Sequence, residues 1–474
     1  MTAWETVIGL EVHVQLATRS KLFCGCATVF GDEPNRNVCP VCLGLPGALP
    51  VPNAAAVRLG ARAALALGAT VHSVSVFARK NYFYPDLPKG YQISQFDRPL
   101  ATGGRVRCES PDRGTVAIGV TRLHLEEDAG KLLHDRVPGR TAIDLNRAGV
   151  PLAEIVSEPE LRSPAEARAY LTVLKQILIY AGVSECSMEK GSLRVDANLS
   201  LRRPGAPLGT KTELKNMNSF ANVERALEIE RERQRLVLDG GGRVEQVTLL
   251  FNADAGTVRP MRGKEESHDY RYFPDPDLPP VVLAPEWLDA VRAELPELPD
   301  AKRARLQEAY GLSLYDATAL SAERSVADYF ESVVHAGSDS KSAANWVMGE
   351  SMPSYREAGV FAVSATRLAD LIGIIKDGTV SHQAAKRVFA ELGAGDEAPL
   401  GVAARLGLLQ VRDDAQLGAW VTEVVAEQSA EVERLRAGEQ KLLAFLVGQV
   451  MKKSRGRADP KAVADRLLTQ IEVS

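Results

Sequence analysis

The sequence lacks the features of several large protein classes. None of its apolar runs is long enough to span a bilayer, and the N-terminus has no basic region followed by an apolar stretch, so no membrane span or secretory signal is expected. The formal net charge of −4 creates no overall attraction to nucleic acid. Six cysteines in 474 residues do not suggest a disulfide framework. We expect a cytoplasmic globular protein with no membrane contact.

Two common catalytic motifs are also missing. The phosphate-binding pattern G-x-x-x-x-G-K-[ST] does not occur, which excludes a P-loop nucleotide hydrolase. The nucleophile pattern G-x-S-x-G is absent too. An ATP-using enzyme built on a carboxylate-rich antiparallel sheet remains compatible with these absences.

What the chain does contain is a set of strands with polar faces. Residues 8–16 alternate strictly between apolar and polar side chains, as in a strand with one buried face. The segments 121–127, 192–200 and 211–217 repeat this pattern with ionisable residues. The polar positions are Glu11, His13 and Gln15; Arg122, His124 and Glu126; Arg194, Asp196 and Asn198; and Lys211, Glu213 and Lys215. We expect one sheet whose polar face is a reaction surface.

Such a face carries more carboxylates than can stay ionised unaided. Two carboxylates ~4 Å apart repel by about 4 kcal/mol at an effective dielectric near 20. Either their pKa values rise or a divalent cation lies between them. Oxygen ligands with one imidazole suit magnesium or manganese, which hold nucleotide phosphates. Lys215 and Arg194 would then neutralise charge during phosphoryl transfer. The run 126–128 also fits a solvated group of acids.

Four cysteines cluster near the N-terminus. Cys24 and Cys26 are separated by twelve intervening residues from Cys39 and Cys42. Two close thiol pairs with glycine and proline in the turns can enclose a tetrahedral zinc ion, although the first pair is tighter than usual. Unligated cysteines or a redox pair are the alternatives. A four-thiolate site at 24–42 would be structural, because it leaves no position for a substrate.

Two loops and the C-terminal segment suggest contacts with RNA. Residues 79–97 and 267–280 mix aromatic and charged groups around prolines, which suits stacking against a nucleotide or an RNA end. Well-packed surface loops would look similar. Near the C-terminus a basic cluster predicts phosphate contact, while a solvated helix end is the alternative. Its members are Lys452, Lys453, Arg455 and Arg457.

Local signals also predict helices and domain limits. Helices are expected over 54–68, from Ser163–Pro164 to Gly182, over 219–238 and over 364–375. Charged helices dominate after Pro280, and the tract 393–399 is typical of a linker. The fold class predicted is therefore α+β, with an antiparallel sheet followed by helical domains.

Five segments closely resemble the B subunit of the aspartyl/glutamyl-tRNA amidotransferase, and the likeness covers essentially the whole chain. They are GLEVHVQL at 9–16, KNYFYPD at 80–86 with YQISQ at 91–95, RLHLEEDAG at 122–130, GSLRVDAN at 191–198 and DYRYFP at 269–274. The resemblance implies a glutamine-synthetase-like catalytic domain at 1–294, a helical domain at 295–398 and a tRNA-binding helical tail at 399–474.

The resemblance also implies an activity, that of a carbon–nitrogen ligase that takes its amide nitrogen from glutamine. ATP would activate the side-chain carboxylate of Glu or Asp misacylated on tRNA(Gln) or tRNA(Asn). Ammonia from the amidase (glutaminase) component A of the complex would then displace phosphate. The small component C would bridge component A and this chain. The cognate non-discriminating synthetase is a further possible partner. The implied cofactors are ATP, Mg²⁺ and a structural Zn²⁺.

Motif position, together with the polar faces of the predicted strands, assigns the residues. The predicted catalytic set is Glu11, His13, Glu126, Glu127, Glu154, Asp196 and Lys215, and the predicted ATP-binding set is Lys80, Arg194 and Glu213. The predicted Mg²⁺ ligands are Glu11, His13, Glu127, Glu154 and Asp196. Two other functions remain open: a non-catalytic tRNA-binding or assembly protein, and a free-standing ligase that joins ammonia to a small amino acid.

Overall fold

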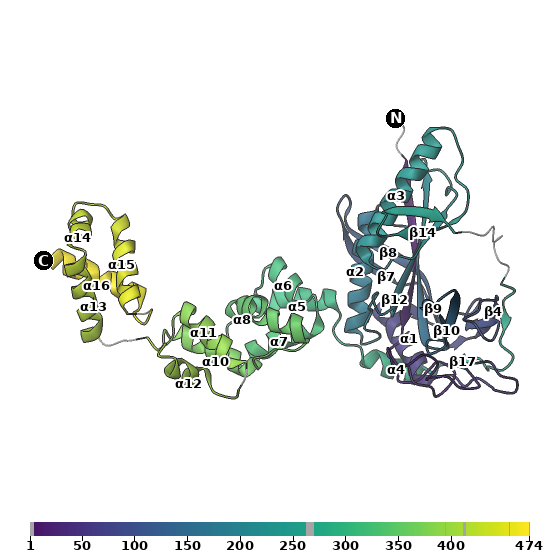
Figure 1. The fold of residues 1–474 in the computed structure, drawn as a ribbon, viewed down its shortest axis with the longest axis horizontal. Coiled ribbons are helices and arrows are strands. Elements are labelled where there is room, and N and C mark those ends of the chain that lie inside the picture. Colours follow the sequence, from purple (N-terminus) through teal and green to yellow (C-terminus); the bar gives the residue numbers. More distant parts are fainter. Residues whose placement is uncertain (1–3, 262–269, 394, 411–413, 455, 474) are drawn as a thin grey trace. The chain divides into compact units, whose positions relative to one another are not determined.

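The computed structural model describes residues 4–473 except 262–269, 394, 411–413 and 455. Contacts divide the chain into two compact units, residues 1–299 and 300–474 (Figure 1). The first unit combines strands and helices, and the second is helical in its described part, as the α+β class predicts. None of the described helices combines the length and apolar character needed to cross a bilayer.

A ten-stranded sheet forms the centre of the first unit. Its order is β15-β14-β13-β12-β1-β11-β8-β6-β2, with β7 paired to β8. The strands are β1 (Glu5–Gln15), β2 (Thr70–Val71), β6 (Ala101–Thr102), β7 (Arg105–Ser110), β8 (Gly114–Glu127), β11 (Pro151–Ser157), β12 (Leu193–Arg202), β13 (Thr212–Lys215), β14 (Thr248–Asn252) and β15 (Thr257–Pro260).

The sheet is mixed rather than purely antiparallel, which corrects the prediction. All its pairs are antiparallel except β13 with β14. The helix α3 (Phe220–Asp239) connects these two strands, and a connection of that length returns the chain to the same end of the sheet. The parallel pair therefore follows from a crossover helix that the sequence pattern itself predicted.

Helices cover the apolar face of this sheet. Leu10, Val12 and Val14 on β1 are at most 1% exposed and belong to one core that includes residues of α2 (Pro164–Tyr180) and α3. Figure 1 shows α2 and α3 against one side of the sheet. The remaining helices of this unit are α1 (Ala54–Ala66) and α4 (Pro285–Ala293). Because alternate residues point to opposite faces, burial of this side leaves the ionisable residues on the other.

Smaller sheets supplement the first unit. They pair β9 (Lys131–Val137) with β10 (Arg140–Asp144), β4 (Ala78–Asn81) with β5 (Tyr91–Ser94) and β16 (Phe273–Pro274), and β3 (Val74–Ser75) with β17 (Val281–Val282).

The second unit holds two separate hydrophobic clusters. One contains buried residues from 306 to 408 and the other from 417 to 471. The helices are α5 (Pro299–Tyr310), α6 (Leu314–Leu320), α7 (Arg324–His335), α8 (Ser340–Trp346), a π-helix (Val347–Ser351), α9 (Met352–Ala358), α10 (Ala365–Lys376), α11 (His382–Leu392), α12 (Pro399–Arg405), α13 (Asp414–Glu427), α14 (Ser429–Arg436), α15 (Lys441–Lys453) and α16 (Pro460–Val473).

The four helices predicted from local signals are present as α1, α2, α3 and α10. The caps explain why three of them begin where they do. Ser163, Ser219 and Ser364 each accept a hydrogen bond from the backbone N–H three residues later.

Candidate active site

Four neighbouring strands bring the predicted polar residues to one face. In the register of the sheet, His124 of β8 lies opposite Glu154 of β11, which lies opposite His13 of β1, which lies opposite Arg194 of β12. Two positions along β1, Glu11 lies opposite Asp196. The strands are thus aligned so that residues far apart in the sequence form one surface, as the alternation predicted.

Three side chains on this face converge closely enough to share a metal ion. His13 Nε2 lies 3.5 Å from Glu126 Oε1 and 3.5 Å from Glu154 Oε2. One ligand atom from each of the three lies within 4.8 Å of the others. Both glutamates are buried. An imidazole with two carboxylates is a donor set that suits Mg²⁺ or Mn²⁺, so these residues could hold such a cation.

His124 supports this cluster. Its Nε2 atom lies 3.2 Å from Glu154 Oε2. Burial disfavours its charged form, but Glu154 and Glu126 outweigh this effect and raise the pKa of His124 to about 9. Burial likewise opposes ionisation of Glu154, yet His124 and His13 hold its pKa well below its ordinary value. Strand alternation predicted that His124 lies on this face, but the sequence analysis assigned it no role. Its position on the same face as Glu126 was the signal that could have identified it.

Next to the cluster, a second row of polar residues on β1, β12 and β13 forms a chain of contacts. Asn198 Nδ2 donates to Glu11 Oε1 at 3.0 Å, and Lys215 Nζ contacts Asp196 and Glu213, each at 3.2 Å. Burial, together with the charges of Glu154, Glu213 and Asp196, raises the pKa of Glu11. Glu11 and Asp196 thus lie next to the three-residue cluster but are not part of it.

Asp128 holds Arg194 in place. Its carboxylate accepts hydrogen bonds from Arg194 Nη2 at 2.8 Å and from Gln15 Nε2 at 3.0 Å. The Asp128 side chain is 2% exposed and that of Arg194 is 37% exposed, so a buried carboxylate anchors a guanidinium that still reaches solvent. The attraction of Asp128, against the opposing effect of burial, raises the pKa of Arg194. Sequence reasoning missed this contact, although the period of two that places Arg122, His124 and Glu126 on one face would, continued by one step, have placed Asp128 there as well.

Glu127 does not join the cluster. Its carboxylate contacts Lys89 Nζ and accepts the backbone N–H of Ile93 at 2.8 Å. It borders a small cavity of about 100 Å³ beside Cys42. Consecutive strand residues point to opposite faces, so Glu126 and Glu127 cannot both face His13. The structure therefore separates Glu127 from the other predicted Mg²⁺ ligands and brings Glu126 to them.

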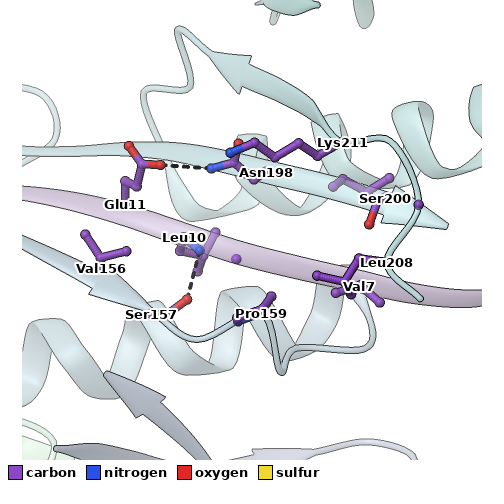
Figure 2. Close-up of a pocket in the computed structure, with 13 residues that line it drawn as sticks. Val7, Leu10, Glu11, Val156, Ser157, Pro159, Asn198, Ser200, Leu208 and Lys211 are labelled. Carbon is purple, nitrogen blue, oxygen red and sulfur yellow. Dashed lines mark hydrogen bonds between the residues drawn. The ribbon is translucent and has the colours of Figure 1, made fainter. Parts of the chain in front are cut away.

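A cavity of about 300 Å³ opens beside the second row (Figure 2). Figure 2 shows Glu11 and Asn198, joined by their hydrogen bond, near Lys211, with Val7 farther along β1 and Leu208 beside it on the loop before β13. The backbone at Gly9 also lines this cavity. The space thus combines apolar walls with a carboxylate, an amide and an amine at one side.

Lys80 approaches the cluster from β4. Its Nζ atom lies 4.8 Å from the centroid of the Tyr270 ring and 5.9 Å from that of Tyr82. Burial lowers the pKa of Lys80, but the charges of Glu126 and other neighbours more than offset this and raise it. Lys80 is therefore a cation beside the acidic cluster.

The cysteine quartet converges as its spacing predicted. Sulfur atoms of Cys24, Cys26, Cys39 and Cys42 lie within 4.8 Å of one another. Cys42 Sγ accepts the backbone N–H of Cys39 at 3.2 Å and lies 3.6 Å from Nζ of the buried Lys21. A hydrogen bond with Cys24, opposed by burial and supported by Cys39 and Lys21, lowers the pKa of Cys42 to about 4. Four converging sulfur ligands fit a tetrahedral metal ion.

The basic tail is partly neutralised within its own unit. Lys453 Nζ contacts Glu423 Oε2 at 2.7 Å and Glu427 Oε1 at 2.6 Å. Arg457 lies over the ring of Trp420, 5.8 Å from its centroid. Lys452 is in the last turn of α15, and Arg455 lies outside the described residues.

Comparison with known proteins agrees with this organisation. Residues 6–289 match the family model described as GatB/GatE catalytic domain, and residues 328–471 match the GatB domain. The chain is 52% identical over 472 residues to the aspartyl/glutamyl-tRNA(Asn/Gln) amidotransferase B subunit of Solidesulfovibrio magneticus, and the match covers 98% of this chain and 99% of that protein.

This chain belongs to the family of aspartyl/glutamyl-tRNA(Asn/Gln) amidotransferase B subunits. The protein of the same name from Moorella thermoacetica is 52% identical over 467 residues, covering 97% of this chain and 98% of that protein. The one from Alkalilimnicola ehrlichii is 51% identical over 475 residues, covering 99% of each. The resemblance seen in the sequence motifs is thus confirmed over the whole chain.

Proposed function

We propose that this chain catalyses ATP-dependent amidation of Glu-tRNA(Gln), Asp-tRNA(Asn) or both, as part of a glutamine-dependent carbon–nitrogen ligase. Family membership supports the reaction class, and the His13–Glu126–Glu154 cluster is the observation that supports catalysis by this chain. A partly buried imidazole and two buried carboxylates on the polar face of a sheet have no need to converge in a purely RNA-binding protein. In the proposed assignment Glu126 takes the ligand position predicted for Glu127.

The cavity beside Glu11 is the proposed site of ATP. Its apolar side, near Val7 and Leu208, suits an adenine ring, and its polar side points along the sheet toward the cluster. Asn198 and Lys211 are placed to donate to ribose or phosphate oxygens. The triphosphate would then extend across Glu11 toward His13.

Each ionisable residue has a role in this arrangement. When bound, Mg²⁺ neutralises phosphate charge and orients the terminal phosphoryl group. His13, Glu126 and Glu154 hold it, while Glu11 and Asp196 lie beside it. Arg194, fixed by Asp128, and Lys215 and Lys80 stabilise negative charge that develops in transfer.

The reaction balances without a further reactant. A side-chain carboxylate oxygen of the aminoacyl group attacks the terminal phosphorus of ATP, the bond to ADP breaks, and an acyl-phosphate forms. The lone pair of ammonia then attacks the acyl carbon, phosphate leaves, and the nitrogen loses a proton to give the amide.

The wider organisation is part of the proposal. The sheet is glutamine-synthetase-like, residues 295–398 form a helical domain and residues 399–474 a tail that contacts tRNA. Zn²⁺ occupies the cysteine quartet as a structural ion. The amidase component A supplies ammonia with the small component C as its bridge to this chain, and the synthetase that misacylates the tRNA is a further partner in the cytoplasm.

Glu154→Gln tests the proposal against a matched change, Glu158→Gln. Glu158 follows the same strand but bonds Thr121 Oγ1 at 2.8 Å, outside the cluster. In the complete complex, Glu154→Gln is expected to lower Gln-tRNA or Asn-tRNA formation by about 100-fold or more, with tRNA binding and partner glutaminase activity retained. Glu158→Gln is expected to stay close to wild type.

A calorimetric titration of Mg²⁺ and ATP into the isolated chain gives an independent check. Binding that Glu154→Gln weakens supports the catalytic role. Full activity in Glu154→Gln, or intact tRNA binding with no nucleotide binding in the wild type, would instead identify a tRNA-binding or assembly protein. Turnover of free glutamate without tRNA would identify a free-standing ligase.

A further inference from the structure

The structure joins the two aromatic loops, which lie far apart in the sequence. Strand β16 pairs with β4, placing Phe273 opposite Arg79. The side-chain amide of Asn81 donates to the carbonyl oxygens of Tyr270 at 3.1 Å and Arg271 at 2.9 Å. The two loops therefore form one structural element, although residues 267–269 lie outside the described part of the chain.

An aromatic stack forms where these loops meet. The rings of Phe96 and Tyr272 lie parallel, with centroids 4.1 Å apart and planes 4° apart. Tyr270 packs edge-on against Tyr272, at 6.0 Å and 73°. Phe96 is 47% exposed, so its ring is covered by Tyr272 on one side and still open to solvent. A flat apolar ring held in this way is a platform to which a planar base can add.

The stack lies beside the acidic cluster. Ser94, two residues before Phe96, places its Oγ atom 3.4 Å from Glu126 Oε2. Lys80 Nζ lies 4.8 Å from the Tyr270 centroid and interacts with the charges of both Glu126 and Glu154. The aromatic rings and the proposed metal ligands thus belong to one continuous site, with Lys80 between them.

We infer that the Phe96–Tyr272 stack binds the terminal adenine base at the 3′ end of the aminoacyl-tRNA; this inference rests on the proposed function. The reacting amino acid is esterified to the ribose of that nucleotide. The base must therefore lie within roughly the reach of one aminoacyl group from the carboxylate being phosphorylated. The exposed Phe96 ring satisfies this requirement, and Lys80 is placed between base and cluster to meet the negative charge of the substrate carboxylate.

The adenine of ATP has the same stacking chemistry, so the experiment must separate the two sources. The cavity lined by Val7, Gly9 and Leu208 lies along β11, β1 and β12, and none of its lining residues comes from β8 or from the two aromatic loops. If ATP binds in that cavity, the Phe96–Tyr272 stack stays available for the 3′ end of the tRNA.

The test combines changes on both sides of the contact. Phe96→Leu removes the aromatic face and retains an apolar side chain, whereas Phe96→Tyr retains the face. Phe83→Leu is the matched control, since Phe83 is 91% exposed in the same loop. Each complete complex is assayed with intact Glu-tRNA and with Glu-tRNA whose terminal nucleotide lacks its base, and KM for tRNA, kcat and KM for ATP are measured.

The expected result is a coupled loss. Removing either the base or the Phe96 ring raises KM for tRNA about 10-fold, and removing both raises it little further, because they are the two halves of one stacking contact. Phe96→Tyr, Phe83→Leu and the KM for ATP are expected to remain close to the wild-type values. Unchanged melting temperatures show that the variants fold.

Three results would overturn the assignment: losses that multiply to about 100-fold in the double change, a rise in KM for ATP with no effect on tRNA, or an equal effect of Phe83→Leu. These differ from failure of the proposed function. In that case the wild-type complex would make no amidated tRNA even from the intact substrate.

Discussion

Glu126→Gln and Glu127→Gln should affect different properties, the first the catalytic rate and the second the stability of the fold. Glu126 faces His13 in the proposed metal site, so Glu126→Gln removes one of two converging carboxylates. Loss of one preorganised electrostatic group typically lowers kcat by about 100- to 1000-fold. The glutamine side chain is nearly isosteric, and its neighbour Ser94 can still donate to its oxygen. We therefore expect a folded but nearly inactive enzyme.

Glu127→Gln should act mainly on stability. The side chains of Lys89 and Glu127 are 9% and 4% exposed, and breaking a buried ion pair leaves the lysine charge uncompensated. Such a loss costs about 3–5 kcal/mol, and the lower end applies because glutamine still accepts the Ile93 N–H group. In a unit of this size that corresponds to a melting temperature lower by about 6 °C.

Paired assays distinguish these outcomes. Amidated-tRNA formation is measured per folded molecule at a temperature well below both transitions, and unfolding is followed by calorimetry. The reasoning would be refuted if Glu127→Gln were inactive at unchanged stability while Glu126→Gln remained active. That result would identify Glu127 as the metal ligand. The end of β8 would then have to turn in the active complex so that Glu127, and not Glu126, faces His13.

Two further predictions concern the cysteine quartet and the helical unit. Cys39→Ser should release zinc, measured with a chromogenic chelator, and lower the melting temperature. The control variant Cys108→Ser changes a cysteine outside the quartet and should retain zinc. Zinc retained in both variants would exclude the proposed site. Burial opposes ionisation of Glu331, but Arg305 and Lys302 lower its pKa to about 2. Ionised Glu331 therefore contributes about 3 kcal/mol that is fully present above pH ~4.5 and lost as pH falls through about 2. The stability difference between wild type and Glu331→Gln in urea titrations should shrink over that range; a constant difference would contradict the assignment.

Local pattern was sufficient to predict much of the polar face that we propose to be catalytic. A strand has a side-chain period of two, so alternation alone placed Glu11 with His13, and Arg194 with Asp196, on common faces. The same rule placed Glu126 with His124 and Glu127 on the other side, although motif position favoured Glu127 as a ligand. Serine caps similarly set the starts of the helices, because a cap satisfies backbone donors within three residues of itself.

Long-range pairing was not encoded in any local signal. Nothing near His13 indicates that β1 lies between β11 and β12, or that the register places His13 opposite Glu154. Register depends on how whole strands bury their apolar sides together, and a shift of one residue would turn every carboxylate away. The parallel pairing of β13 and β14 likewise depends on where α3 returns the chain.

The sequence by itself determined the periodicity of the strands, the cysteine spacing and the helix starts, because each depends on interactions between residues close together in the chain. Only the tertiary structure decided that Glu126 completes the cluster, that Asp128 fixes Arg194, and that Phe96 stacks on Tyr272. Those contacts join residues on strands and loops that are distant in the sequence. Their geometry exists only once the core has fixed the sheet.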